Sequence, residues 1–121
     1  RWENKKGLRG SDEILSVGFN QTFDAFALGT RHGIILYRMS CDTLERVAES
    51  DKVGDVGIVE MLFGTTLVAL VGAGFDQASL SPRRLCLWNT RTAAPICEVP
   101  FNTAILGVKL NRKRLVVALM K

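Results

Sequence analysis

The chain has 121 residues, of which 47% are hydrophobic and 23% charged, and its formal net charge is +4. This composition is typical of a globular domain and excludes a disordered chain, and no run approaches the ~18 apolar residues that a membrane-spanning helix needs. The first six residues, RWENKK, lack the apolar segment of a secretory signal. We therefore expect a soluble cytoplasmic protein.

The three cysteines, Cys41, Cys86 and Cys97, include no Cys-x-x-Cys pair. An odd number of such isolated cysteines argues against a disulfide framework and against a zinc site, so we expect free thiols. The excess of basic residues favours an anionic partner, but it does not choose between acidic peptides, lipid headgroups and nucleic acid.

Along the chain, the first predicted elements are four short strands at residues 14–20, 25–30, 33–38 and 44–48. These runs are rich in Val, Ile, Leu and aromatic residues, and turn residues such as Asn20-Gln21-Thr22 separate them. No segment keeps a helical period for ten residues with caps. The pattern therefore predicts an all-β fold.

The same series of elements then repeats at residues 58–64, 67–72, 84–89 and 96–101, and a third series begins at 105–111 and 114–119. The three series begin at Ile14, Ile58 and Ile105, which lie 44 and 47 residues apart. The second series is seven residues longer than this spacing predicts, and we expect the extra residues between Gly72 and Arg84.

Four strands in a period of about 40–45 residues predict the blades of a β-propeller. We expect an N-terminal extension at 1–13, blade 1 at 14–50, blade 2 at 51–104 with an enlarged loop at 73–84, and a truncated blade 3 at 105–121. A β-sandwich is the alternative, but it does not explain a fourfold repeat. About two and a half blades leave open faces, so we expect a fragment, or a chain completed by a partner or by copies of itself.

Four motifs in this order resemble the PROPPIN (WIPI) family of autophagy proteins. They are residues 19–21 with 29–33 (FNQ and GTRHG), residues 58–63 with 67–72 (IVEMLF and LVALVG), residues 80–85 with 89–90 and 96–99 (LSPRRL, NT and ICEV), and residues 105–117 (ILGVKLNRKRLVV). The third motif resembles the fungal autophagy branch in particular. The resemblance covers residues 14–121.

The resemblance implies a seven-bladed scaffold that binds phosphatidylinositol 3-phosphate and phosphatidylinositol 3,5-bisphosphate on pre-autophagosomal, endosomal or vacuolar membranes. In the family, a Phe-Arg-Arg-Gly motif in a later blade binds these lipids. The sequence has no such motif, and its only adjacent arginines are Arg83 and Arg84 after Pro82. We therefore assign no lipid-binding residue to this chain.

The enlarged loop is the first candidate site, because loops on rigid scaffolds commonly carry binding. By the resemblance, Pro82 and Arg83, with Arg84 beside them, match the region that docks the large lipid-transfer protein of autophagy. Proline restricts the backbone, and an arginine fork suits a carboxylate of a partner. The alternative is a solvated turn that leads into a strand.

The second candidate site is the basic turn around Arg112. By the resemblance, Arg112 matches a contact for a coiled-coil protein of the conjugation machinery, and its neighbours Lys109, Lys113 and Arg114 add positive charge. A solvated turn is again the alternative.

The remaining function classes lack their residues. His32 has no nucleophile set around it, Glu60 and Asp55 are expected to accept structural hydrogen bonds, and Gly72-Ala-Gly74 lacks the residues of a phosphate loop. We expect no enzyme, no cofactor and no nucleic-acid binding. A generic WD40-type adaptor without lipid binding stays open as the alternative, although it predicts Gly-His and Trp-Asp dipeptides, which are absent here.

Overall fold

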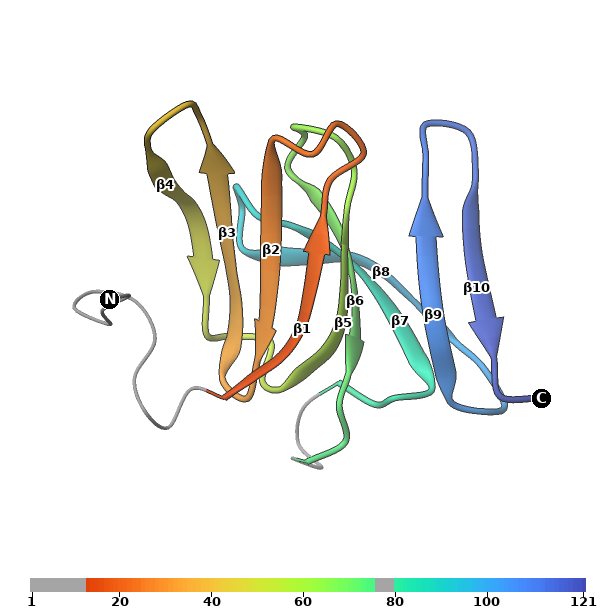
Figure 1. Ribbon diagram of the computed structural model, residues 1–121. Helices are drawn as coiled ribbons and strands as arrows, with labels where there is room; N and C mark the ends of the chain where they lie inside the picture. The colour runs from red at the N-terminus through yellow and green to blue at the C-terminus, as the bar shows by residue number, and fades with distance from the viewer. Residues whose placement is uncertain (1–12, 76–79) are drawn as a thin grey trace.

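The computed structural model describes residues 13–75 and 80–121, and within these ranges every regular element is a β-strand (Figure 1). The strands are β1 (Ile14–Phe19), β2 (Ala25–Thr30), β3 (Gly33–Met39), β4 (Leu44–Ser50), β5 (Val56–Met61), β6 (Leu67–Gly72), β7 (Arg84–Asn89), β8 (Ala94–Pro100), β9 (Ile105–Leu110) and β10 (Leu115–Leu119).

The strands form three antiparallel sheets in chain order: β1-β2-β3-β4, β5-β6-β7-β8, and β9-β10. We call these sheets blade 1, blade 2 and blade 3. The first strands of the three blades are neighbours: β5 contacts both β1 and β9 (Figure 1). The last strands, β4 and β8, lie on the outside. The predicted all-β propeller class is confirmed, with the blades forming part of a ring.

The predicted alignment of the first strand of blade 2 with that of blade 1 was wrong by two residues. Ile14 pairs with the last residue of β2 next to a bulge, and Val56 pairs with the last residue of β6 next to the same kind of bulge. Val56, 42 residues after Ile14, is therefore the structural counterpart, and Ile58 is not. Side chains alternate with a period of two, so a slip of two residues keeps every side chain on its face and leaves the apolar pattern unchanged.

The insertion in the enlarged loop of blade 2 is also longer than the sequence predicted. Two residues separate β2 from β3, whereas eleven separate β6 from β7, so the blade 2 connection is longer by nine residues rather than seven. The extra residues lie between Gly72 and Arg84, where the sequence predicted them. Residues 76–79 of the predicted loop lie outside the described residues.

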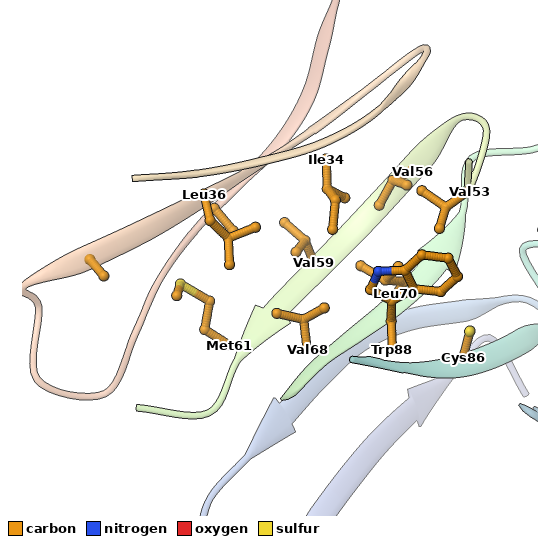
Figure 2. Close-up of a cluster of buried hydrophobic side chains, with 12 residues drawn as sticks. Ile34, Leu36, Val53, Val56, Val59, Met61, Val68, Leu70, Cys86 and Trp88 are labelled. Carbon is orange, nitrogen blue, oxygen red and sulfur yellow. The ribbon is translucent and has the colours of Figure 1, made fainter. Parts of the chain in front are cut away.

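A hydrophobic core fills the junction between blades 1 and 2 (Figure 2). Blade 1 contributes Ala25, Ala27, Ile34 and Leu36, and blade 2 contributes Val56, Val59, Met61, Val68, Leu70, Cys86 and Trp88. Burial of each large aliphatic side chain stabilises the fold by about 2 kcal/mol. This junction fixes the angle between the two blades.

A second core fills the junction between blades 2 and 3. Its buried members are Ala69, Val71, Leu85, Ile105 and Val108. These residues of blade 2 lie on the face opposite to the first core, because alternate residues of a strand point to opposite faces. Blade 2 is therefore covered on both faces, whereas blades 1 and 3 are each covered on one.

Antiparallel pairing sends successive connections to opposite ends of the blades. The turns β1–β2, β5–β6 and β9–β10 lie at one end, here called the upper end, and the connections β2–β3, β4–β5, β6–β7 and β8–β9 lie at the lower end (Figure 1). The three cysteines are free, with Cys86 buried and the other two exposed. Among the described residues, no helix is long and apolar enough to cross a membrane.

Candidate functional site

The two predicted docking sites lie at opposite ends of the blades. Arg112 is in the β9–β10 turn at the upper end, whereas Pro82, Arg83 and the start of β7 at Arg84 are at the lower end (Figure 1). The structure does not bring the two sites together.

The backbone of the lower site connects blade 2 to blade 3. The amide of Ile105 donates to the Pro82 carbonyl over 2.9 Å, and the amide of Phe101 donates to the Arg83 carbonyl over 2.8 Å. The amide of Arg83 in turn donates to the Ser81 hydroxyl. The backbone of Pro82 and Arg83 is therefore hydrogen-bonded to the β8–β9 connection and to the first residue of β9.

Two glycines let the descending part of the loop lie against its returning part. A Cβ at Gly72 would lie 1.8 Å from the Leu80 carbonyl oxygen, so no side chain fits there. Gly74 has a φ of +89°, in the region that favours glycine, and a Cβ built on it would lie 3.4 Å from Cγ of Pro82. The loop is therefore closed at its base before it reaches residues 76–79.

Two contacts hold Phe75 at the start of this loop: one with Asp55, just before β5, and one with Arg31 of blade 1. Asp55, which is 1% exposed, accepts a hydrogen bond from the amide of Phe75 over 2.6 Å. The guanidinium of Arg31 in the β2–β3 turn stacks on the Phe75 ring, with Cζ 4.2 Å from the ring centroid. The loop is thus held to blades 1 and 2 at Phe75, and its returning end is bonded to the start of β9.

The side chains of the lower site differ in availability. Arg84 is paired with Glu98 of β8 at 3.4 Å. Arg83 is exposed, and its guanidinium makes one long contact, 3.4 Å, with the Asn102 carbonyl. Since a guanidinium carries five donors, Arg83 keeps most of them for a partner. Pro82 is half-buried against Gly74.

The upper site is a tight turn that presents Arg112. The Asn111 carboxamide oxygen accepts hydrogen bonds from the amides of Lys113 and Arg114, both over 2.8 Å. This side chain fixes the turn, as Asn commonly does. Arg112 is exposed, and its Cζ lies 4.2 Å above the ring of Phe63, which comes from the β5–β6 turn of blade 2. A cation–π contact therefore holds the guanidinium across the boundary between blades 2 and 3.

Sequence reasoning missed the residue that supports this arrangement, Gln21. Its Nε2 donates to the carbonyls of Met61, over 2.7 Å, and Leu110, over 2.6 Å, and its Oε1 accepts from the amide of Phe63 over 2.5 Å. One side chain of blade 1 therefore bonds the ends of β5 and β9. The sequence placed Gln21 in a turn, but nothing in it indicated partners 40 and 89 residues away.

Glu60 and Asp55 accept backbone hydrogen bonds, which is the structural role predicted for them. Glu60 is 8% exposed and accepts from the amide of Leu110 over 3.3 Å. Burial raises the pKa of Glu60, while Lys109 and the Leu110 amide act in the opposite direction. Among the described residues, no group of three His, Cys, Asp or Glu side chains is placed to hold a metal ion.

Comparison with known proteins agrees with the blade architecture. The PROPPIN family model matches residues 14–121. Autophagy-related protein 18 of Yarrowia lipolytica is 50% identical over 109 residues, which are 90% of this chain and 26% of that protein.

Two solved structures share the fold. Hsv2 of Kluyveromyces lactis has a TM-score of 0.75 at 23% identity and is matched by 90% of this chain over 31% of its own length. KlAtg21, solved in complex with the coiled coil of AgAtg16, has a TM-score of 0.64 at 32% identity, over 88% of this chain and 33% of that chain. The chain thus spans about a quarter to a third of the length of these proteins. It belongs to the PROPPIN family of β-propellers.

Proposed function

We propose that this chain is the partner-docking part of a non-enzymatic autophagy scaffold that acts at autophagy membranes. The match to the PROPPIN family model and to proteins named for autophagy supports this proposal. Family membership favours it over a generic WD40-type adaptor without lipid binding. Docking of protein partners is assigned to the two sites described above.

The observation that carries the proposal is the held guanidinium of Arg112. A stacked arginine that is pre-positioned at the surface loses little further side-chain freedom when it binds a carboxylate. The neighbour KlAtg21 was solved with a coiled coil bound, and coiled coils commonly carry acidic side chains at their flanking positions. We therefore propose that the upper site binds a coiled-coil protein of the conjugation machinery through Arg112.

The test is a titration of the complete propeller with the coiled coil of the Atg16 protein from the same organism. We expect Arg112→Glu to weaken binding by about tenfold or more, since it replaces an attractive charge with a repulsive one. Lys113→Glu is the matched control, because Lys113 is the next residue in the turn and also exposed. Equal losses in both variants would reduce the effect to net charge and contradict a specific role of Arg112.

We propose the lower site as a separate docking site, for the autophagy lipid-transfer protein. Supporting this, Arg83 keeps free donors while its backbone is fixed to blade 3. Arg83→Ala should weaken that partner more than Arg84→Ala, because Arg84 is already paired with Glu98. Peptides from the lipid-transfer protein, titrated into the same propeller, measure this. Equal affinity in wild type and Arg83→Ala would remove Arg83 from the site.

We propose that the complete protein binds phosphatidylinositol 3-phosphate and phosphatidylinositol 3,5-bisphosphate through blades outside this chain. The absence of a Phe-Arg-Arg-Gly motif from the 121 residues supports this assignment. Vesicles with and without phosphatidylinositol 3-phosphate should sediment the complete protein selectively and the 121-residue chain without preference. Selective sedimentation of the chain alone would contradict the assignment.

A further inference from the structure

The upper site depends on contacts that converge from three blades. Arg112 rests on Phe63, and both residues are built on backbone that other blades hold. Phe63 has a φ of +49°, which is uncommon for a residue with a side chain. Such a conformation persists only where its surroundings fix it. For Phe63, the amide is fixed by Oε1 of Gln21 from blade 1.

The base of the Arg112 turn is held in the same way. Leu110, the last residue of β9, has its carbonyl bonded by Nε2 of Gln21 and its amide bonded to the Glu60 carboxylate. The amide of the next residue, Asn111, closes the turn onto the Arg114 carbonyl over 2.9 Å. The turn therefore has little freedom to move relative to blades 1 and 2.

We infer that Gln21 is the positioning residue of the Arg112 docking site, holding the Phe63 ring and the base of the Arg112 turn in one fixed relation. Gln21 is the side chain that contacts both halves: Phe63 through its oxygen, and Met61 and Leu110 through its nitrogen. Gln21 is half-buried and these hydrogen bonds are to backbone groups, so it can act through Phe63 and Leu110 without touching the partner. This inference deepens the proposed function and rests on it for the binding measurement alone.

The chemistry of the carboxamide is suited to this role. A side chain with one acceptor and two donors satisfies one amide and two carbonyls at the same time, and among uncharged side chains only Asn and Gln offer this combination. Gln21→Glu keeps the acceptor for Phe63 but sets a carboxylate against two carbonyl oxygens. Gln21→Leu keeps the approximate volume and removes all three hydrogen bonds.

The decisive experiment is a double-mutant cycle in the complete propeller, with the coiled coil of Atg16 as the probe. Gln21→Leu should weaken binding by about as much as Arg112→Ala, on the order of tenfold, and should have no further effect once Arg112 is alanine. Phe63→Leu, which keeps the amide and removes the ring, should behave like Gln21→Leu. Thr22→Ala, on the same turn, is the matched control and should bind as wild type.

A merely structural role of Gln21 predicts a different outcome. Loss of global stability would also weaken the Arg83 site at the lower end and would add to the Arg112→Ala loss. Unchanged lower-end binding in Gln21→Leu, together with non-additivity at the upper end, supports positioning. Additive losses, or equal losses at both ends, overturn it.

A partner-free measurement separates this inference from the proposed function. A guanidinium above an aromatic ring is shielded, so the Arg112 side-chain proton resonances should lie upfield in the wild type. They should return toward the values of an exposed arginine in both Gln21→Leu and Phe63→Leu. If the coiled coil fails to bind while this shift behaves as expected, the proposed partner is wrong and the positioning role stands. An unchanged shift in Gln21→Leu overturns the positioning role.

Discussion

Equivalent faces of blades 1 and 2 differ in burial: the face is covered on blade 2 and exposed on blade 1. On blade 2, Val59 and Met61 are 4% and 3% exposed, because blade 1 covers them. The counterparts on blade 1, Val17 and Phe19, are 56% and 50% exposed. The residues at these positions are apolar in both blades, so both faces are suited to burial. The exposed fractions differ because a neighbouring blade covers only the face of blade 2.

The open face of blade 1 also has the large side chains of a junction. Phe26 lies between Phe19 and Tyr37, with ring centroids 5.9 Å and 5.3 Å away, respectively. Tyr37 occupies the position that the buried Trp88 has in blade 2. Exposed apolar patches of this kind mark interaction surfaces. We therefore expect another blade to cover this face in the complete protein.

The largest effect should come from placing a charge at matched positions on the two faces. Val59→Asp buries a carboxylate without a partner, and we expect it to abolish cooperative unfolding of the 121-residue chain. Val17→Asp places the same group on the open face and should change the free energy of unfolding by no more than about 0.5 kcal/mol. Thermal and urea melts of the two variants measure the contrast.

The same pair sharpens the comparison in the complete propeller. If another blade covers the face of blade 1, Val17→Asp should become almost as damaging there as Val59→Asp. A complete propeller that tolerates Val17→Asp would show that the face remains open, and the expected covering by another blade would be wrong.

The comparison also shows how far the sequence could predict the fold. Short runs rich in Val, Ile, Leu and aromatic residues, bounded by turn residues, identified β2, β6 and β7 with their observed bounds. Such runs could not fix the register of blade 2, because a slip of two residues preserves the face of every side chain. The pairing of Val56 with Gly72 fixes the register, and this information lies in the hydrogen bonds.

The candidate docking sites were also only partly predictable from the sequence. Pro82, Arg83 and Arg112 came from a resemblance to a family, and strand alternation alone places them at opposite ends. The support from Gln21 was not predictable, since its contacts join residues 89 positions apart and depend on how blades 1, 2 and 3 stack. Local sequence indicates where turns and strands occur, but it does not indicate which turns contact one another between blades.

A smaller effect, which requires no substitution, is the protection of Cys86. Cys86 lies on the covered face of blade 2, and burial, with Glu98 and Cys97 adding, raises its pKa to about 11. At pH 8, iodoacetamide should label the exposed Cys41 and Cys97 and leave Cys86 unmodified, because the thiolate is the reactive form. Peptide mass spectrometry measures the labelling of each site. Labelling of Cys86 at the rate of Cys97 would mean that the junction opens readily.

The smallest effect should be the pH dependence that Glu60 gives to the junction. Its structural counterpart in β1 is Gly18, where a Cβ would lie 2.6 Å from the Val59 carbonyl, so only blade 2 has a carboxyl group at this position. Burial raises the pKa of Glu60 above its usual 4.5, and the folded chain therefore holds this proton more tightly than the unfolded chain does. The contribution of Glu60 is fully present below pH 4.5 and declines as pH rises through the folded value.

Glu60→Gln isolates this contribution, because a glutamine oxygen still accepts from the Leu110 amide and does not ionise. The difference in urea midpoint between wild type and Glu60→Gln should shift in favour of the variant as pH rises from 4 to 7. Asp42→Asn in the exposed β3–β4 turn is the control for the loss of one carboxylate. If the wild type instead gains stability relative to Glu60→Gln as pH rises, the attraction of Lys109 outweighs the effect of burial on the pKa of Glu60. The ionised carboxylate would then stabilise the contact between blades 2 and 3.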